Sequence, residues 1–469
     1  MSYPLSKETY VDNNNETHNK TGQDMSKLSV EAPESRGFYI KVKYKFVISF
    51  VVSLFWLILS IYLSFPWLKE LAELTNCFLS IFIIAGIAYL PGWMNSFLVM
   101  SLLLDKQPKY KDEDPEDDIT ILIAAFNEQD MIYSTLKYIE GQDYKGNIRI
   151  IVINNNSSDR TYEEVERAKN ELNINVECMD EPNPGKFNAL NKALTTVDTK
   201  YTVTIDADTL LHKSAIRYLV ARIKSSPDDV QAVAGTVLVK NSRDNFLSRI
   251  QEWDYFLSIA SIKRMQGLFQ GTLVAQGAFS LYKTEVLLEI GGWSDAIGED
   301  IVLTWDILHR GYRVFFESLA IAFTDVPVQF SHFTKQRSRW ARGMIEGIRK
   351  VKPWQQPSLY SKYLTGINLI IPYIDFAYTF FWIPGLILAF FGKYYIVGIM
   401  SLAVLPMTLI TFMQLFYYQK KRVFDVLNLK VRKNTLGFIL FLLCYQILMS
   451  PISMYGYIQE VFRMKRIWK

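Results

Sequence analysis

The sequence has few cysteines, little net charge and no apolar segment at its start, and each shortage excludes something. The three cysteines, Cys77, Cys178 and Cys444, are scattered, so we expect neither a disulfide framework nor a zinc site. A net charge of +4 is too small to indicate nucleic-acid binding. Residues 1–36 are polar and lack the apolar core of a signal peptide, which predicts a disordered cytosolic tail.

Long apolar runs are abundant further along the chain. With 469 residues, of which 50% are hydrophobic, the chain is long enough for one soluble domain and several membrane helices. We predict two transmembrane helices in region 40–104 and about three transmembrane segments in region 365–458. The runs that carry this prediction are residues 46–65, 76–104, 366–391, 394–418 and 436–457.

The distribution of basic residues predicts the orientation in the membrane. Three lysines precede the first apolar run, so the positive-inside rule places that end, and the polar region after the second run, in the cytosol of a multi-pass plasma-membrane protein. Five crossings put the basic tail 459–469 on the opposite side, against the same rule. The alternative is a re-entrant C-terminal segment, for which 366–391 is the strongest candidate because it contains Pro372, Asp375 and Pro384.

The polar region between the apolar runs has the pattern of an α/β domain. Runs at 119–126, 149–153 and 200–205 are typical of buried strands, and helical patterns at 131–138 and 161–172 separate them. This alternation predicts a mostly parallel sheet with helices on both faces, inserted between transmembrane helices. Ligands of such sheets bind beyond the carboxyl ends of the strands. The polar residues expected there are Asn127, Asn154, Asn155, Asp206 and Asp208, and Glu128 follows Asn127.

Asp206 and Asp208 lie two residues apart directly after a predicted strand. Two carboxylates in such a turn can share one Mg²⁺ or Mn²⁺, which prefer hard oxygen ligands and are often completed by substrate phosphates. The alternative is an Asx-turn that only ends the strand. Gly185-Lys186 stands at a predicted helix start, where a lysine and backbone N–H groups suit a phosphate.

An acidic pair, Glu299-Asp300, follows Gly298 at the start of an amphipathic helix. It can cap the helix, which stabilises a helix by about 1 kcal/mol. It can also supply a general base that deprotonates an attacking hydroxyl, and we assign that role to Asp300 rather than to Glu299.

Gln336, Arg339 and Trp340 have helical i, i+3, i+4 spacing, so they share one helix face. An arginine there can bind diphosphate oxygens, and a tryptophan can stack on a sugar ring. The alternative is an interfacial membrane helix within 336–364, an interpretation that Lys335, Arg337 and Arg342 also fit.

In this order, these motifs resemble those of the processive inverting family 2 glycosyltransferases, and most closely those of the poly-β-1,6-N-acetylglucosamine synthases. The resemblance covers about residues 40–460 and includes Gln276-Gly277-Ala278-Phe279, where the family usually has SGAF. It implies a nucleotide-sugar transferase fold for 105–335. One departure is Asn154-Asn155-Asn156-Ser157, where the family has an acidic DDGS-like sequence that contacts uridine.

The resemblance also implies an activity and its partners. We expect a membrane-embedded, inverting N-acetylglucosaminyltransferase that polymerises a UDP-sugar into a β-linked extracellular polysaccharide of the biofilm type and couples synthesis to export. The partners expected are a UDP-sugar donor, a growing polysaccharide acceptor, membrane lipid and an accessory membrane subunit. The donor site is assigned to Asn127, Glu128, Asn155, Lys186, Asp206 and Arg339, the metal to Asp206 and Asp208, and the acceptor to Gln276, Gly277, Glu299, Gln336 and Trp340.

Three other functions remain open from the sequence. A hyaluronan or capsular polysaccharide synthase would need a different donor set, and a non-processive transferase would add one sugar to a lipid. A non-enzymatic transporter would use the central domain as a regulatory module and would not need Asp206, Asp208 or Asp300.

Overall fold

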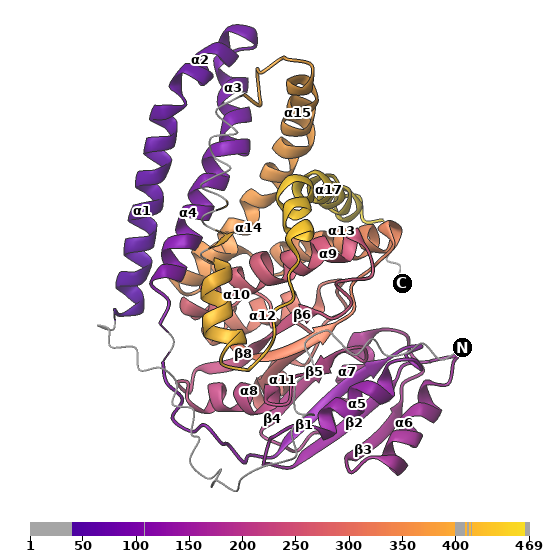
Figure 1. The fold of residues 1–469 in the computed structure, drawn as a ribbon. Helices are drawn as coiled ribbons and strands as arrows, with labels where there is room; N and C mark the ends of the chain where they lie inside the picture. Colours follow the sequence, from indigo (N-terminus) through magenta and orange to yellow (C-terminus); the bar gives the residue numbers. More distant parts are fainter. Residues whose placement is uncertain (1–39, 107, 399–408, 410–411, 414, 465–469) are drawn as a thin grey trace, which may run out of the picture.

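Short apolar runs form one eight-stranded sheet in the part of the chain that the structure, a computed structural model, describes (residues 40–106, 108–398, 409, 412–413 and 415–464; Figure 1). The strand order is β3-β2-β1-β4-β7-β6-β8-β5. The strands are β1 (Ile119–Ala125), β2 (Ile148–Asn154), β3 (Asn175–Asp180), β4 (Tyr201–Ile205), β5 (Leu210–Leu211), β6 (Val230–Val239), β7 (Phe279–Lys283) and β8 (Arg313–Thr324).

The sheet is parallel in its first half and mixed in its second. β1 pairs in parallel with β2 and β4, and β2 with β3, so the three strands predicted from the sequence are confirmed as parallel neighbours. β7 is antiparallel to β4 and β6, with Phe279 opposite Ile205. The reversed strand therefore begins where β4 ends, and it brings the Gln276–Ala278 segment beside Asp206.

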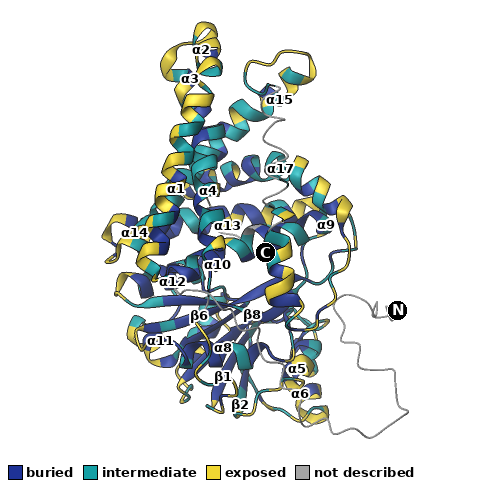
Figure 2. Ribbon diagram, turned by 60° about the vertical axis from the view of Figure 1, so that its left-hand side comes forward, coloured by how far each residue is buried: buried dark blue, intermediate teal, exposed yellow. Residues whose placement is uncertain are grey.

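Helices cover both faces of the sheet, as the sequence predicts. Alternate residues of a strand point to opposite faces. Ile121 packs in one core cluster with α5, α6 and α8, whereas Leu122 packs in another with α7, α11 and α12. Figure 2 shows the resulting buried centre. The helices are α5 (Ile132–Glu140), α6 (Thr161–Glu171), α7 (Lys186–Leu194), α8 (Ala215–Lys224), α11 (Thr284–Ile290) and α12 (Glu299–His309).

Among the described residues, four helical stretches are long and apolar enough to cross a membrane. They coincide with four of the five predicted transmembrane segments, and the fifth, 394–418, lies in large part outside the described residues. The stretches are α1 (Val42–Leu63); Cys77–Leu103, which contains α3 (Cys77–Ile84) and α4 (Leu90–Leu103); Leu359–Phe390, which contains α14 (Leu359–Ala377) and α15 (Ile383–Phe390); and α17 (Thr435–Val461). α1 and α4 stand side by side, away from the sheet (Figures 1 and 2).

A layer of helices separates the sheet from these stretches. It contains α9 (Phe246–Trp253), the π-helical turn η3 (Asp254–Ile259), α10 (Ala260–Leu268) and α13 (Phe330–Lys350). α17 packs along this layer at both of its ends. At its start, Asn434 donates to Arg249 O (3.0 Å) and accepts from the Trp253 indole (2.9 Å). At its end, Glu460 pairs with Arg349 (3.1 Å) of α13.

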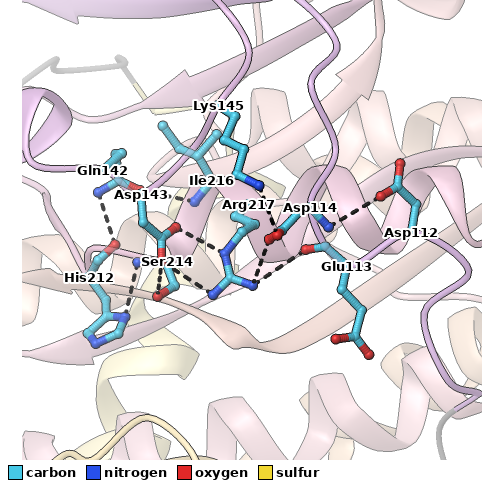
Figure 3. A network of polar contacts seen from close by, with 10 residues as sticks. All are labelled: Asp112, Glu113, Asp114, Gln142, Asp143, Lys145, His212, Ser214, Ile216 and Arg217. Atoms are coloured by element: carbon cyan, nitrogen blue, oxygen red, sulfur yellow. Dashed lines mark hydrogen bonds and ion pairs between the residues drawn. The ribbon is translucent and has the colours of Figure 1, made fainter. Parts of the chain in front are cut away.

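The charged linker between α4 and β1 is fastened to the domain rather than loose (Figure 3). Arg217 of α8 forms ion pairs with Asp143 (3.0 Å) and with Asp114 of the linker (3.7 Å), and Lys145 also contacts Asp114 (3.1 Å). Lys224 pairs with two further linker carboxylates. These contacts hold residues 112–117 of the linker against the sheet domain.

Candidate functional site

The two carboxylates after β4 are held by a turn of the backbone. The N–H of Thr209 donates to Asp206 O (3.0 Å), and Ala207 O accepts from the Thr135 hydroxyl (2.7 Å). Burial, together with the neighbouring Asp206 charge, raises the pKa of Asp208 to about 6. Two carboxylates crowded in this way gain from a shared cation. The two hydrogen bonds that hold the turn are accepted by backbone oxygens and do not use the carboxylates. Both carboxylates are partly accessible.

Lys186 brings a positive charge to this pair. Gly185, with a φ of 129°, lets the chain turn into α7, and Lys186 Nζ then donates to Asp206 Oδ1. The same nitrogen lies 4.0 Å from Glu299 Oε1. Burial alone would lower the pKa of Lys186, but the charges of Asp206 and Glu299 outweigh it and raise that pKa. The lysine therefore stays charged beside the carboxylates, where it could bind a diphosphate.

Gly277 lies between Lys186 and the Glu299-Asp300 pair and contacts both. A Cβ at this position would lie 2.7 Å from Lys186 Nζ, so a larger residue would push the lysine ammonium away from its present position. The Gly277 N–H donates to Asp300 Oδ2 (3.4 Å), while Asp300 Oδ1 accepts from the N–H of Ile301 (2.8 Å). Asp300 thus stabilises the start of α12 with one oxygen and faces the Gly277 loop with the other.

Glu299 is buried beside Asp300. Burial and the Asp300 charge raise the pKa of Glu299 to about 7. Of the acceptor residues predicted with it, Gln276 donates to Gly235 O (2.7 Å), so part of its amide holds the loop in place. The acceptor role of both residues stays a prediction.

Gln336, Arg339 and Trp340 lie on one helix, α13, but differ in their exposure to solvent. Arg339 is exposed and Trp340 is 37% exposed, whereas Gln336 is half-buried. Arg337 lies beneath Trp340, 4.1 Å from the ring centroid, and pairs with Asp254 (2.9 Å). Arg337 and Arg342, which the interfacial alternative assigns to a membrane-facing surface, are instead buried and paired.

Two glycines dock this helix against the acidic pair. A Cβ on Gly298 would lie 2.8 Å from Gly343 Cα, and a Cβ on Gly343 would lie 2.9 Å from Gly298 Cα. The two backbones are therefore in direct contact, which places the start of α12 against α13. Farther along, Glu346 of α13 accepts from the N–H of Ile297 (2.7 Å).

The polar residues after β1 and β2 form the neighbouring side of the site. Asn127, with a φ of 56°, donates its N–H to the Ser157 hydroxyl (3.0 Å) and accepts from Ser158 N (2.8 Å). The amide of Asn155 donates to two carbonyls and accepts from Gly185 N (2.8 Å). Both amides thus shape the loops, and Glu128 follows in the same turn. Their contact with a nucleotide stays a prediction.

Two further residues lie near the site but belong to none of the motifs identified in the sequence. Tyr255 of η3 lies 6.2 Å from Trp340 between ring centroids, and burial, with smaller contributions from the charges of Asp206 and Asp208, raises its pKa to about 12. Lys263 of α10 lies near Asp300; burial lowers its pKa to about 7, and the Asp300 charge opposes that shift only in part. Neither residue belongs to a motif with a characteristic spacing, so no local signal in the sequence marks it.

The region that contains these residues is similar to known proteins. A family model described as "Glycosyltransferase like family 2" matches residues 115–343. A poly-β-1,6-N-acetyl-D-glucosamine synthase of Staphylococcus aureus (strain MSSA476) is 35% identical over 241 residues, 51% of this chain and 57% of the relative. The chain thus spans just over half the length of that relative. The synthase of the same name from Staphylococcus epidermidis is 30% identical over 312 residues, 64% of this chain and 73% of the relative.

A solved structure resembles most of the fold. A mannosyltransferase from Pyrobaculum calidifontis, in complex with GDP-Man and Mn²⁺, matches with a TM-score of 0.56 at 20% identity, covering 82% of this chain and 99% of that one. At this identity the likeness shows a shared fold.

Proposed function

Because the chain belongs to the family 2 glycosyltransferases, we propose that it polymerises N-acetylglucosamine from UDP-N-acetylglucosamine into a β-linked polysaccharide. The observation that carries the proposal is the convergence of four separate motifs. Lys186, Asp206, Gly277 and the Glu299-Asp300 pair come from four segments and meet within hydrogen-bond or ion-pair distance. The named activity of the staphylococcal relatives supports this choice of sugar over a hyaluronan or capsular product.

The donor diphosphate belongs beside Lys186. In the described residues no group of three or more His, Cys, Asp or Glu side chains could hold a metal, so Asp206 and Asp208 would share Mg²⁺ or Mn²⁺ with substrate oxygens. The metal, when bound, stabilises the charge of the leaving diphosphate. Lys186 and the exposed Arg339 would bind the phosphate oxygens. The part of the site that binds the nucleoside would be lined by Asn127, Glu128 and Asn155.

Asp300 is the proposed general base. Its Oδ2 lies at the Gly277 loop, where the acceptor sugar would sit with Gln276, Gln336 and Trp340. The carboxylate takes the proton of the acceptor hydroxyl while that oxygen attacks the anomeric carbon opposite the leaving diphosphate, which inverts the configuration. Glu299, buried behind Asp300, would position the acceptor and strengthen the base when it is ionised.

The apolar helices extend the proposal to the membrane. The chain would be a multi-pass plasma-membrane protein, with the sheet domain cytosolic and the polymer exported between the helices. Inside this group, Asp375 of α14 accepts from Ser450 (2.9 Å) and Tyr457 (2.7 Å) of α17, so a buried carboxylate joins two of the helices. Membrane lipid and an accessory membrane subunit are the further partners that we propose.

The test is nucleotide release by the purified full chain in nanodiscs with Mg²⁺ or Mn²⁺. UDP-N-acetylglucosamine, UDP-glucose and UDP-glucuronate would be supplied singly and in pairs, and the product sized. Release with UDP-N-acetylglucosamine alone and a long product is the expected result. A requirement for two donors would indicate hyaluronan or a capsular polymer, and a short lipid-linked product would indicate single transfer. No release with any donor would contradict the proposal.

A further inference from the structure

A cavity of about 410 Å³ lies where α13 meets the end of α17, outside the site described above. Four of its lining side chains are basic and two are acidic, which leaves an excess of two positive charges. The lining residues used here are Arg342, Glu346, Arg349, Lys350, Glu460 and Arg463.

The acidic residues are already paired, and one basic residue is not. Glu460 binds Arg349 Nη1 (3.1 Å) and Arg342 Nε (3.4 Å), and Glu346 accepts from Ile297 N. Within the described part of the chain, the exposed guanidinium of Arg463 has no hydrogen-bond or ion-pair partner. The uncompensated charge is therefore concentrated at the mouth of the cavity.

The position of the cavity suggests which anion it binds. α17 is apolar enough to enter a membrane, yet both of its ends contact the helical layer on the sheet domain, at Asn434 and at Glu460. A helix that is held against this layer at both ends lies along the layer rather than pointing away from it, which puts Arg463 on the side of the sheet domain, at the level of lipid headgroups. That arrangement also places Arg463 where the positive-inside rule prefers a basic residue.

We propose that this cavity binds the phosphate group of an anionic phospholipid. Basic pockets between membrane helices on the cytoplasmic side suit such headgroups, and an arginine fork matches phosphate oxygens. The inference rests on the proposed membrane embedding of α17. Because Glu346 holds Ile297, just before the Glu299-Asp300 pair, a bound headgroup would also support the proposed active site.

The test measures lipid retention, which does not depend on transferase activity. The full chain would be extracted in neutral detergent, supplied with phosphatidylglycerol or phosphatidylcholine, and examined by native mass spectrometry. Arg463→Glu and Lys350→Glu change exposed residues of the cavity, whereas Lys421→Glu makes the same charge change outside it. We expect retained phosphatidylglycerol to fall about fivefold or more in either cavity variant, and to be unchanged in Lys421→Glu.

Three outcomes would overturn the proposal. The first is equal retention of phosphatidylglycerol in the wild type and both cavity variants. The second is a loss of phosphatidylglycerol in Lys421→Glu as large as the loss in the cavity variants. The third is displacement of the lipid by an equal concentration of inorganic phosphate, which would make soluble phosphate the ligand. Nucleotide release measured on the same samples separates this proposal from the enzymatic one. Loss of lipid retention with donor turnover still present leaves the transferase function standing.

Discussion

The strand-end cluster and the α13–α17 layer use charge in opposite ways. At the strand ends, Lys186 contacts Asp206, which stays partly accessible, and burial together with the Asp206 charge raises the pKa of Asp208 to about 6. In the helical layer, Arg337 and Asp254 are both buried and hold elements together. The charges at the strand ends remain available to a substrate, whereas those in the helical layer stabilise the fold.

This difference separates residues that react from residues that position. A buried pair that loses one partner leaves an uncompensated charge in the interior, whereas an accessible cluster can exchange a protein partner for a substrate group. Substitutions at the strand ends should therefore change catalysis at nearly constant stability, and substitutions in the layer should change stability first.

The largest effect is expected from Asp300→Asn. The amide keeps the size and the bond to Ile301 but removes the basic carboxylate, so turnover should fall by about 10²- to 10⁴-fold, the range typical of a general base. Donor binding, measured by calorimetry with UDP, should remain. Asp306→Asn makes the same change on the same helix and should retain activity. Turnover near the wild-type rate in Asp300→Asn would remove this residue from the mechanism.

The next comparison is between two arginines two residues apart. Arg337→Met leaves Asp254 buried without its partner and should lower the free energy of unfolding by about 3–5 kcal/mol. Arg339→Met changes an exposed residue, so stability should stay within about 0.5 kcal/mol. Its kcat/KM should fall about 10- to 100-fold if it binds the diphosphate, because a hydrogen bond to a charged group contributes about 1.5–3 kcal/mol.

Thermal unfolding in detergent and donor kinetics together test this pair. The contrast fails if Arg339→Met unfolds as early as Arg337→Met, or if Arg337→Met is as stable as the wild type.

The same contrast explains what the sequence could predict. The parallel strands β1, β2 and β4 and their polar ends follow from local patterns, since a strand-end residue is positioned by its own strand. The reversal at β7 and the contact between Gly298 and Gly343 do not, because each depends on a partner distant in sequence. Arg337 looked like a membrane-facing arginine because nothing nearby in the sequence indicates its pairing with Asp254.

A smaller effect is expected at the contact between the two glycines. Gly343→Ala places a methyl group 2.9 Å from Gly298 Cα, so the backbones must separate, at a cost of about 1–3 kcal/mol. Turnover should fall with stability because the displaced segment carries Asp300. Gly366→Ala in α14 is the matched control, since a Cβ there meets nothing within 4 Å, and alanine should gain up to about 1 kcal/mol in a helix. Equal melting temperatures for the two variants would contradict the close contact.

The smallest effect concerns pH and tests whether the strand-end charges act together. Burial and Asp300 raise the pKa of Glu299 to about 7, so Glu299 is protonated below that pH and ionises above it. An ionised Glu299 adds a second negative charge beside the proposed base, which favours transfer of the proton from the acceptor hydroxyl. The wild-type kcat should therefore rise about two- to fivefold as pH increases through 7. Glu299→Gln should lose this step, whereas Glu289→Gln, at an exposed ion pair away from the site, should retain it. A step that persists in Glu299→Gln would assign the titration to another group and leave Asp300 to act without this neighbour.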